Sequence, residues 1–303
     1  MINIKGLVAA PFTAFKEDGT LDIERVAFQQ KYYKDNGITG VFACGTTGEG
    51  SALTLCEKKA LLKEWCKYKD DNFAVIGFLG GTSTMECIDL AKYAQECGAS
   101  AVAMTAPYYQ KAANVKDLAL TLAEVASAVP EMPFFYYHIP CLTHVEFKMY
   151  ALLKEVDALI PNFAGIKYTF EDMMDFQLCL NFKDHKYNMM WGRDEMLLEA
   201  LAIGAETFIG STYGYNAPIY TEIIKAYKAG DMKLAADLQY EACKIIEYLG
   251  KYGNGSGKAF MKAAGCDLGP TRRPFHTLTA EEYAAFTEDL KSCRFEEFKC
   301  RVK

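Results

Sequence analysis

Lys167 stands in the segment Gly-Ile-Lys-Tyr-Thr at 165–169, whose other residues are small, apolar or aromatic. In a strand, side chains alternate, so Lys167 would point away from the face that carries Ile166 and Tyr168. Burial disfavours an ammonium and lowers the lysine pKa, and a neutral amine attacks carbonyls. The segment therefore indicates Schiff-base chemistry. The residues alone leave open a lysine that reaches solvent at the strand end.

A phenol lies in a second strand-like segment, Phe-Phe-Tyr-Tyr-His-Ile-Pro at 134–140. With a period of two, Tyr137 shares a face with Phe135 and Ile139, while His138 lies on the opposite face. A phenol beside a reactive lysine can carry protons to and from a substrate hydroxyl or a carbinolamine. The alternative is an aromatic side chain that only fills an interior.

One further turn carries polar groups that suit a small anionic ligand, and another adds a hydroxyl group at the same rim. The turn Gly-Thr-Thr-Gly-Glu-Gly at 45–50 offers backbone N–H groups and the hydroxyls of Thr46 and Thr47, which could hold a carboxylate. Ser211, in Gly-Ser-Thr at 210–212, adds another hydroxyl. An ordinary connecting loop is the alternative for a turn of this composition.

Two acidic residues, Asp194 and Glu195, follow the strand-like segment that ends at Trp191 and Gly192. Adjacent carboxylates accept several hydrogen bonds, so they suit the hydroxyls of a polyol. The alternative is that they only complement the N-terminus of the following helix.

Neither a metal nor a cofactor is expected. The four histidines, His138, His144, His185 and His276, form no His-Glu-x-x-His pattern, and the eleven cysteines include no Cys-x-x-Cys pair. A lysine that bonds covalently to its substrate supplies its own electron sink, so it needs no external cofactor.

These residues must be positioned by a repeating pattern of strands and helices. Strands are predicted at 6–15, 40–45, 73–80, 101–109, 134–140, 163–169, 187–192 and 207–213. Helices are predicted at 21–36, 54–69, 83–96, 115–129, 147–156, 172–182, 195–203 and 217–229. Eight such units predict a (β/α)8 TIM barrel, whose reactive groups lie at the carboxyl ends of the strands. A doubly wound sheet is less favoured, because no Gly-x-Gly-x-x-Gly loop follows the first strand.

Three more helices are predicted beyond the barrel, at 231–252, 257–264 and 278–293. No linker or low-complexity segment precedes them. We therefore predict a barrel over 1–230 and a C-terminal helical extension over 231–303 that packs on the barrel as part of one structural unit.

Composition narrows the class of protein. The 303 residues are 51% hydrophobic with a net charge of -6, which suits a globular enzyme and argues against nucleic-acid binding. No apolar run approaches the roughly 20 residues of a membrane span, so no membrane association is expected. No secretory leader is recognised, and the irregular cysteines fit a reducing cytoplasm.

Three motifs together resemble the dihydrodipicolinate synthase and N-acetylneuraminate lyase superfamily: Gly-Thr-Thr-Gly-Glu at 45–49, Tyr-His-Ile-Pro at 137–140 and Gly-Ile-Lys at 165–167. The similarity spans nearly the whole chain. It implies a pyruvate-dependent aldolase in which Lys167 forms the Schiff base and Tyr137 transfers protons. A non-catalytic protein that binds sugar acids on the same scaffold is a rival interpretation.

Other residues favour one branch of that superfamily. Leu142 stands where the synthases place an arginine, and Gly-Arg-Asp-Glu at 192–195 is similar to the sialic acid lyases. This resemblance implies reversible cleavage of N-acetylneuraminate to N-acetylmannosamine and pyruvate. The synthase reaction and a 2-keto-3-deoxy sugar acid aldolase are the nearest alternatives. His144, where glycine is expected, and Cys141, where alanine is usual, depart from the resemblance.

The resemblance also implies roles for individual residues. Thr46 and Thr47 should hold the substrate carboxylate, and a further set should contact the glycerol chain and sugar hydroxyls: Thr169, Gly192, Asp194, Glu195 and Ser211. Tyr109 matches a tyrosine that the family often lends to a neighbouring subunit, so a homotetramer is implied.

Overall fold

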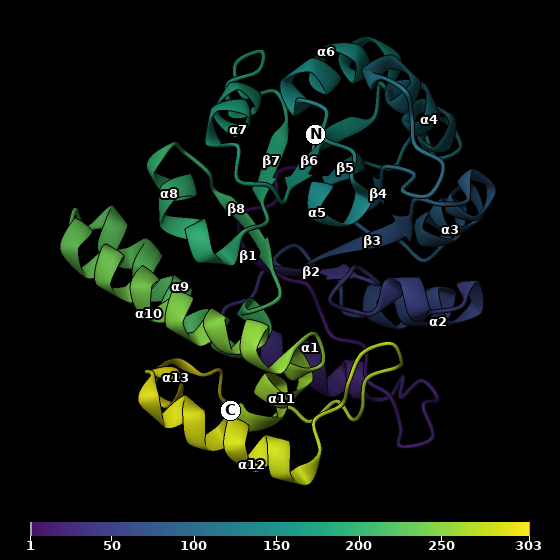
Figure 1. The fold of residues 1–303 in the computed structure, drawn as a ribbon. Helices are drawn as coiled ribbons and strands as arrows, with labels where there is room; N and C mark the ends of the chain where they lie inside the picture. Colours follow the sequence, from purple (N-terminus) through teal and green to yellow (C-terminus); the bar gives the residue numbers. More distant parts are fainter. Residues whose placement is uncertain (1, 303) are drawn as a thin grey trace.

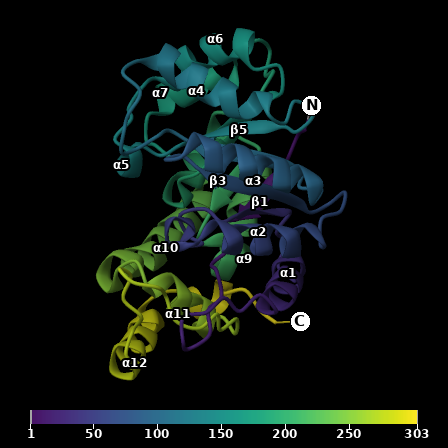
Figure 2. The ribbon, with the colours of Figure 1, turned by 90° about the vertical axis from the view of Figure 1, so that its right-hand side faces the viewer.

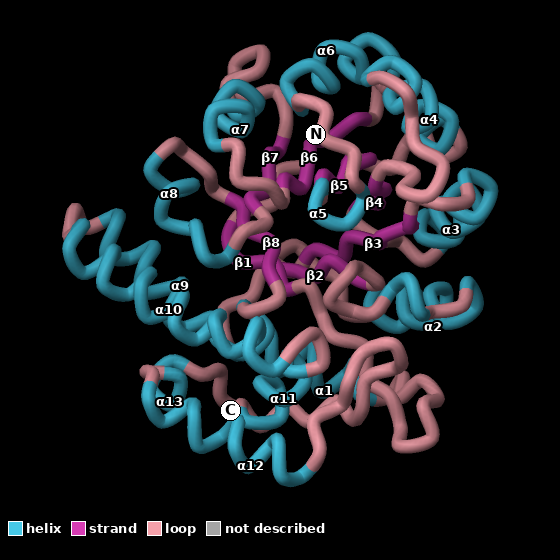
Figure 3. The backbone as a smooth tube through the Cα atoms, in the orientation of Figure 1, coloured by secondary structure: helices cyan, strands magenta, loops and turns pink. Residues whose placement is uncertain are grey.

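The computed structural model describes residues 2–302 and contains a closed barrel of eight parallel strands in chain order. Figure 3 shows the strands at the centre and the helices around them. The strands are β1 Gly6–Ala9, β2 Gly40–Ala43, β3 Ala74–Gly80, β4 Ala101–Thr105, β5 Phe134–His138, β6 Phe163–Tyr168, β7 Asn188–Trp191 and β8 Thr207–Gly210. The barrel closes through β1 and β8, where Val8 pairs with Ile209. The predicted (β/α)8 TIM barrel is confirmed.

A helix follows each strand, as predicted, and the helices form the outer ring in Figure 1. They are α1 Arg25–Asp35, α2 Leu55–Cys66, α3 Thr84–Glu96, α4 Val115–Ser127, α6 Met149–Leu159, α7 Met173–Leu180, α8 Leu197–Ala202 and α9 Tyr213–Lys228. Thr54 caps α2 in a reciprocal pair with Glu57, which satisfies two N–H groups that the helix leaves unpaired. None of the helices within residues 2–302 is both long and apolar enough to span a membrane.

Seven of the eight strands end earlier than the sequence predicts, while β3 ends at Gly80 as predicted. β4 ends at Thr105 rather than at 109, and β8 ends at Gly210 rather than at 213. The apolar runs continue past the strands into the loops of the rim, so hydrophobic pattern alone overestimates strand length. Tyr109 and Ser211 consequently lie in loops.

A short helix that the sequence did not predict, α5 Pro140–Thr143, follows β5 directly. It ends at His144, whose φ of 51° lies in the left-handed region that favours glycine. The backbone thus gives a physical reason for the glycine that the resemblance led us to expect there.

Hydrophobic side chains pack on both faces of the strands, one set inside the barrel and the other between the strands and the helices. Val8, Phe42, Phe135 and Ile209 belong to the cluster inside the barrel. The alternate strand residues, such as Tyr136, belong to the larger cluster that lies between the strands and the helices. Burying each large side chain of this kind contributes roughly 1.5–3 kcal/mol, which fixes the strand register and therefore which residues face inward.

The C-terminal segment adds α10 Met232–Tyr252, α11 Ser256–Ala263, α12 Ala280–Asp289 and the short α13 Phe295–Phe298, which the sequence did not predict. Figures 1 and 2 show α10 alongside α9, and α12 on the far side of α11 from the strands. Phe260 of α11 stacks on Tyr215 of α9 at 4.6 Å between ring centroids and contacts Phe286 of α12 edge-on. Aromatic packing therefore joins these helices to α9.

Candidate active site

Lys167 and Tyr137 lie side by side in the barrel interior. They are register partners on β6 and β5, and both are nearly fully buried, at 4% and 3% exposure. The Lys167 Nζ atom lies 4.0 Å from the centroid of the Tyr137 ring and 4.1 Å from that of Phe42 on β2. The structure thus places the amine against two aromatic faces, as the alternation of β6 predicts for an inward-facing residue.

Burial controls the protonation of Lys167. Loss of hydration lowers the pKa of the Lys167 ammonium to about 7, although the nearby Asp194 carboxylate acts in the opposite direction. With a pKa near 7, roughly half of the lysine is a neutral amine at neutral pH, whereas an ordinary lysine is almost wholly charged. The site therefore holds a nucleophile ready to attack a carbonyl.

Tyr137 keeps its proton. Burial raises the pKa of the Tyr137 phenol to about 12, and the hydroxyls of Thr46 and Thr169 partly oppose the rise. At neutral pH the side chain is thus a neutral phenol that can donate a proton beside the lysine. Thr105 Oγ1 donates to the Tyr137 carbonyl oxygen at 2.9 Å and helps to fix this part of β5.

Asp194 occupies a buried position in the turn after β7, Asp194–Met196. Its Oδ2 atom accepts hydrogen bonds from the Thr212 backbone N–H at 3.0 Å and the Thr212 hydroxyl at 2.6 Å. Burial raises the pKa of this carboxyl to about 6, and the bonds from Thr212 oppose that rise. The loop after β8 thus holds the Asp194 carboxylate in place. This carboxylate lies close enough to Lys167 to raise the pKa of its ammonium.

Gly192 makes room for Thr169. A Cβ atom at position 192 would lie 2.0 Å from Thr169 Oγ1, closer than any real contact. The Thr169 hydroxyl is one of those near the Tyr137 phenol. The absence of a side chain at Gly192 therefore helps to place a group that interacts with the proton donor.

A cavity of about 250 Å³ opens over the carboxyl ends of the strands. Its wall includes Thr46, Tyr137 and Leu142, and the remaining residues are Gly45, Ser51, Phe78, Thr105, Tyr108, Ile139 and Thr143. Larger hollows occur elsewhere, one of about 500 Å³ beside Asn188 and Thr207 where β7 and β8 begin. The amino ends of barrel strands serve stability, so the smaller cavity beside Tyr137 is the candidate site.

Comparison with known proteins agrees with this arrangement. The family model described as "Dihydrodipicolinate synthetase family" matches residues 3–293. The chain belongs to this family.

Among named family members, the chain is 35% identical to the N-acetylneuraminate lyases of Rattus norvegicus and Homo sapiens, each over 98% of this chain and 94% of the relative. Among solved structures, the Proteus mirabilis N-acetylneuraminate lyase superposes with a TM-score of 0.93 at 33% identity, covering 97% of this chain and 100% of that one. The Aliivibrio salmonicida N-acetylneuraminate lyase gives 0.93 at 31% identity, covering 97% and 98%.

Some residues predicted from the family resemblance are less deeply buried than Lys167. The Glu195 carboxylate is half-buried and pairs with Arg193 at 3.3 Å, and Arg193 also pairs with Glu171 in the loop after β6. Thr47 is half-buried next to Thr46, and Ser211 is half-buried after β8.

Tyr109 is 87% exposed in the loop after β4 and does not line the cavity of its own chain.

Phe42, Phe78 and Thr143 are site residues that the sequence did not single out. Phe42 and Phe78 meet the Tyr137 ring edge-on at 5.3 and 5.7 Å between centroids. Alternation alone gave no signal for them, because both faces of β2 and β3 carry only apolar residues and glycine. Thr143 lies on the unpredicted α5, so no predicted element placed it at the rim.

Proposed function

We propose that this chain is a class I aldolase that cleaves N-acetylneuraminate reversibly to N-acetylmannosamine and pyruvate. The observation that carries the proposal is the buried Lys167 amine, with a pKa near 7, against the Tyr137 phenol at the carboxyl end of the barrel. The named relatives favour N-acetylneuraminate as the substrate. Leu142 supports this branch, because it lines the cavity where an arginine would bind a second carboxylate.

The reaction begins when neutral Lys167 attacks the C2 ketone of the open-chain sugar, forming a carbinolamine. Tyr137 donates its proton to the carbinolamine hydroxyl, which leaves as water and gives a protonated imine and a phenolate. The positive iminium forms 4 Å from the phenol ring, so it stabilises the phenolate that its own formation produces.

Cleavage then uses the Tyr137 phenolate that imine formation has produced. The Tyr137 phenolate takes the proton of the C4 hydroxyl while the C3–C4 bond breaks, its electron pair passes into the iminium, and N-acetylmannosamine leaves as the aldehyde. Tyr137 next protonates C3 of the enamine. Water adds to the resulting imine while the phenolate takes its proton, and collapse of the carbinolamine returns the amine and releases pyruvate. This sequence needs no external cofactor or metal.

Polar residues at the rim bind the carboxylate and the hydroxyl groups of the substrate in this proposal. Thr46 and Thr47 hold the carboxylate next to C2, while Thr169, Asp194, Glu195 and Ser211 contact the hydroxyl groups, with Gly192 leaving space beside Thr169. Asp194 suits this task because Thr212 already orders its carboxylate.

The working enzyme in this proposal is a homotetramer in which Tyr109 of a neighbouring copy reaches the site. The support is the family resemblance together with the 87% exposure of this large aromatic side chain at the rim. We place the reaction in the cytoplasm, since the cysteines of the chain are free and irregularly spaced, which suits a reducing compartment.

Borohydride reduction in the presence of pyruvate, followed by mass spectrometry, tests the covalent step. Wild type should gain a reduced pyruvate adduct on Lys167 and should release N-acetylmannosamine from N-acetylneuraminate, whereas Lys167→Ala should do neither. An adduct without sialic acid cleavage would indicate a different pyruvate-dependent aldolase. Tight sugar-acid binding with no adduct would indicate a non-catalytic binding protein instead.

A further inference from the structure

Glu49 has a backbone conformation that its residue type disfavours. It is the fifth residue of the turn at 45–50, its φ of 56° lies in the left-handed region, and its side chain is 3% exposed. The neighbouring Gly50 is equally constrained, because a Cβ atom there would lie 1.8 Å from the Cys44 carbonyl oxygen. A strained residue in a tight turn persists only where its surroundings fix it.

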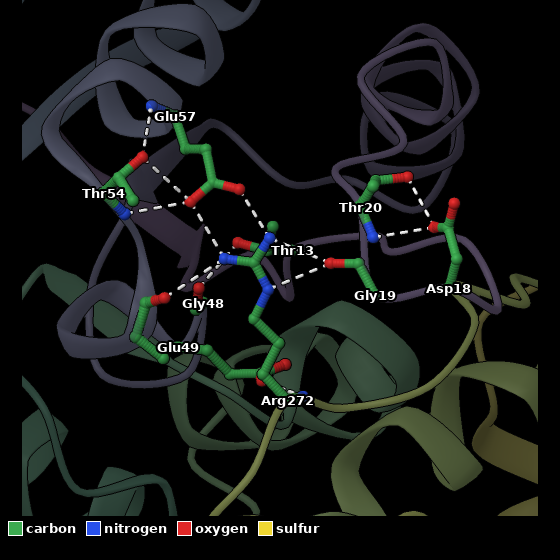
Figure 4. Close-up of polar contacts among 10 residues, drawn as sticks. Thr13, Asp18, Gly19, Thr20, Gly48, Glu49, Thr54, Glu57 and Arg272 are labelled. Atoms are coloured by element: carbon green, nitrogen blue, oxygen red, sulfur yellow. Dashed lines mark hydrogen bonds and ion pairs between the residues drawn. The ribbon is translucent and has the colours of Figure 1, made fainter.

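The surroundings of Glu49 come from the far end of the chain. Its Oε1 atom lies 2.9 Å from Nζ of Lys258, which is the third residue of α11. Its Oε2 atom accepts the backbone N–H of Arg272 at 2.7 Å, as Figure 4 shows. The C-terminal segment therefore contacts both carboxylate oxygens, one through an ion pair and the other through a hydrogen bond.

Lys258 and Arg272 are themselves held firmly. Nζ of Lys258 donates to the Pro270 carbonyl at 2.6 Å and lies 4.3 Å from the centroid of the Phe15 ring. The Arg272 guanidinium bonds Glu57 in the first turn of α2 and the carbonyl oxygens of Ala52 and Gly19 (Figure 4). Arg272 thereby ties the segment after β2 to the N-terminus of α2.

The turn transmits the position of Glu49 to the two threonines. The Glu49 N–H donates to the Thr46 carbonyl at 3.0 Å, and the Thr13 hydroxyl donates to the Gly48 carbonyl at 2.6 Å. Thr46 is thus bonded directly to Glu49, Thr47 lies between Thr46 and Gly48 in the chain, and Thr46 lines the cavity beside Tyr137. A shift of the Glu49 carboxylate would therefore move the threonine hydroxyls.

We propose that Lys258, acting through Glu49, is a positioning residue that sets Thr46 and Thr47 at the spacing required by the substrate carboxylate. The assignment rests on the proposed function, since it presupposes that these threonines bind that carboxylate. Burial lowers the pKa of Lys258 to about 8 while Glu49 opposes that effect, so the pair is held together against a desolvation cost. Buried ion pairs add little net stability, which makes specific geometry the better reason for this one.

Two ketone probes separate positioning from general damage. Borohydride trapping on Lys167 would be measured against pyruvate concentration and against acetone concentration, because acetone has a methyl group in place of the carboxylate. The variants are Glu49→Gln, Lys258→Met and the double variant. Lys251→Met is the matched control, since Lys251 makes an exposed ion pair with Asp289 between α10 and α12.

For Glu49→Gln and Lys258→Met, the pyruvate concentration for half-maximal trapping should rise at least tenfold while acetone trapping stays within about twofold. With N-acetylneuraminate, KM should rise at least tenfold and kcat should change less than threefold. The control should match wild type. If removal of one charge prevents folding, as circular dichroism would show, the double variant decides, because it leaves no unpaired buried charge.

Equal losses with both probes, or unchanged pyruvate trapping in every variant, would overturn the inference and leave the aldolase proposal intact. Failure of wild type to trap pyruvate would instead overturn the aldolase proposal and the inference with it. The wild-type measurement therefore distinguishes the two failures.

Discussion

Tyr136 and Tyr137 are consecutive residues of β5 whose side chains lie on opposite faces of the barrel wall. Tyr137 belongs to the cluster inside the barrel, and Tyr136 to the layer between the strands and the helices. Both are almost completely buried. The chain thus offers two tyrosines in similar surroundings, of which one adjoins Lys167.

Removal of the Tyr137 hydroxyl should slow the reaction without disturbing the fold. Tyr137→Phe keeps the ring that packs on Phe42 and Phe78 but loses the proton donor, so kcat should fall about 10²- to 10⁴-fold. Tyr136→Phe is the control and should retain kcat within a few-fold. Steady-state kinetics with N-acetylneuraminate measures both, and comparable losses in the two variants would refute the assignment of Tyr137.

Lys167→Met should stabilise the protein at low pH. The folded-state pKa of about 7 lies below the value of roughly 10.4 for an unfolded lysine, so the unfolded wild-type chain binds more protons between these values. Wild-type stability therefore rises with pH through this window relative to the variant.

The free energy of unfolding of Lys167→Met should exceed that of wild type by on the order of 2 to 4 kcal/mol at pH 6, and this difference should shrink toward pH 10. Urea unfolding of both proteins at pH 6 and pH 9 provides the comparison. The same difference at both pH values would show that Lys167 is not desolvated in the folded state.

The rate of imine formation should fall as the pH drops through about 7, because the Lys167 ammonium is not a nucleophile. In Asp194→Asn the loss of a negative charge removes an interaction that favours the ammonium. The fall in rate on the acid side of the pH profile, its acid limb, should therefore move to lower pH by roughly half a unit to one unit.

The rate of borohydride trapping with saturating pyruvate, measured from pH 5 to pH 9, tests the Asp194 effect. Since Asp194 has a pKa of about 6, the wild-type limb belongs to the coupled pair rather than to Lys167 alone. A limb that moved to higher pH in the variant would contradict the electrostatic account.

Gly192→Ala should impair cleavage by displacing Thr169. Its new methyl group would lie 2.0 Å from Thr169 Oγ1, so the threonine must shift from its position near the Tyr137 phenol. We expect kcat/KM for N-acetylneuraminate to fall at least tenfold. Gly250→Ala is the control, because a methyl group there meets no atom within 4 Å. Full activity in Gly192→Ala would show that the precise place of Thr169 is unimportant.

The sequence predicted those parts of the site that depend on local alternation. Lys167 lies on a short strand whose two faces differ in residue type, Tyr137 lies on a predicted strand on the face opposite Tyr136, and consecutive strands of a parallel barrel are neighbours. Their side-by-side placement follows from these two facts. The strand ends were overestimated because the apolar runs extend into the rim loops, as at Tyr109.

The partners of Glu49 could not be predicted in this way. Arg272 is separated from Glu49 by 223 positions, and neither periodicity nor a motif links α11 to the turn at 45–50. The sequence indicated only that helices follow the barrel. Contacts between their side chains and the turn depend on how α11 packs against α9, which no local pattern specifies.

That long separation has a consequence for the order in which the protein is made. A ribosome that adds about 5 to 20 residues per second needs roughly 10 to 45 seconds to travel from Glu49 to Arg272. Late in that interval the nascent chain already contains Lys167 and Tyr137, while the Glu49 carboxylate still lacks Lys258 and Arg272 as partners. Synthesis of the C-terminal segment therefore supplies the last side chains that contact Glu49, so this turn reaches its final set of contacts only after the whole barrel has been made.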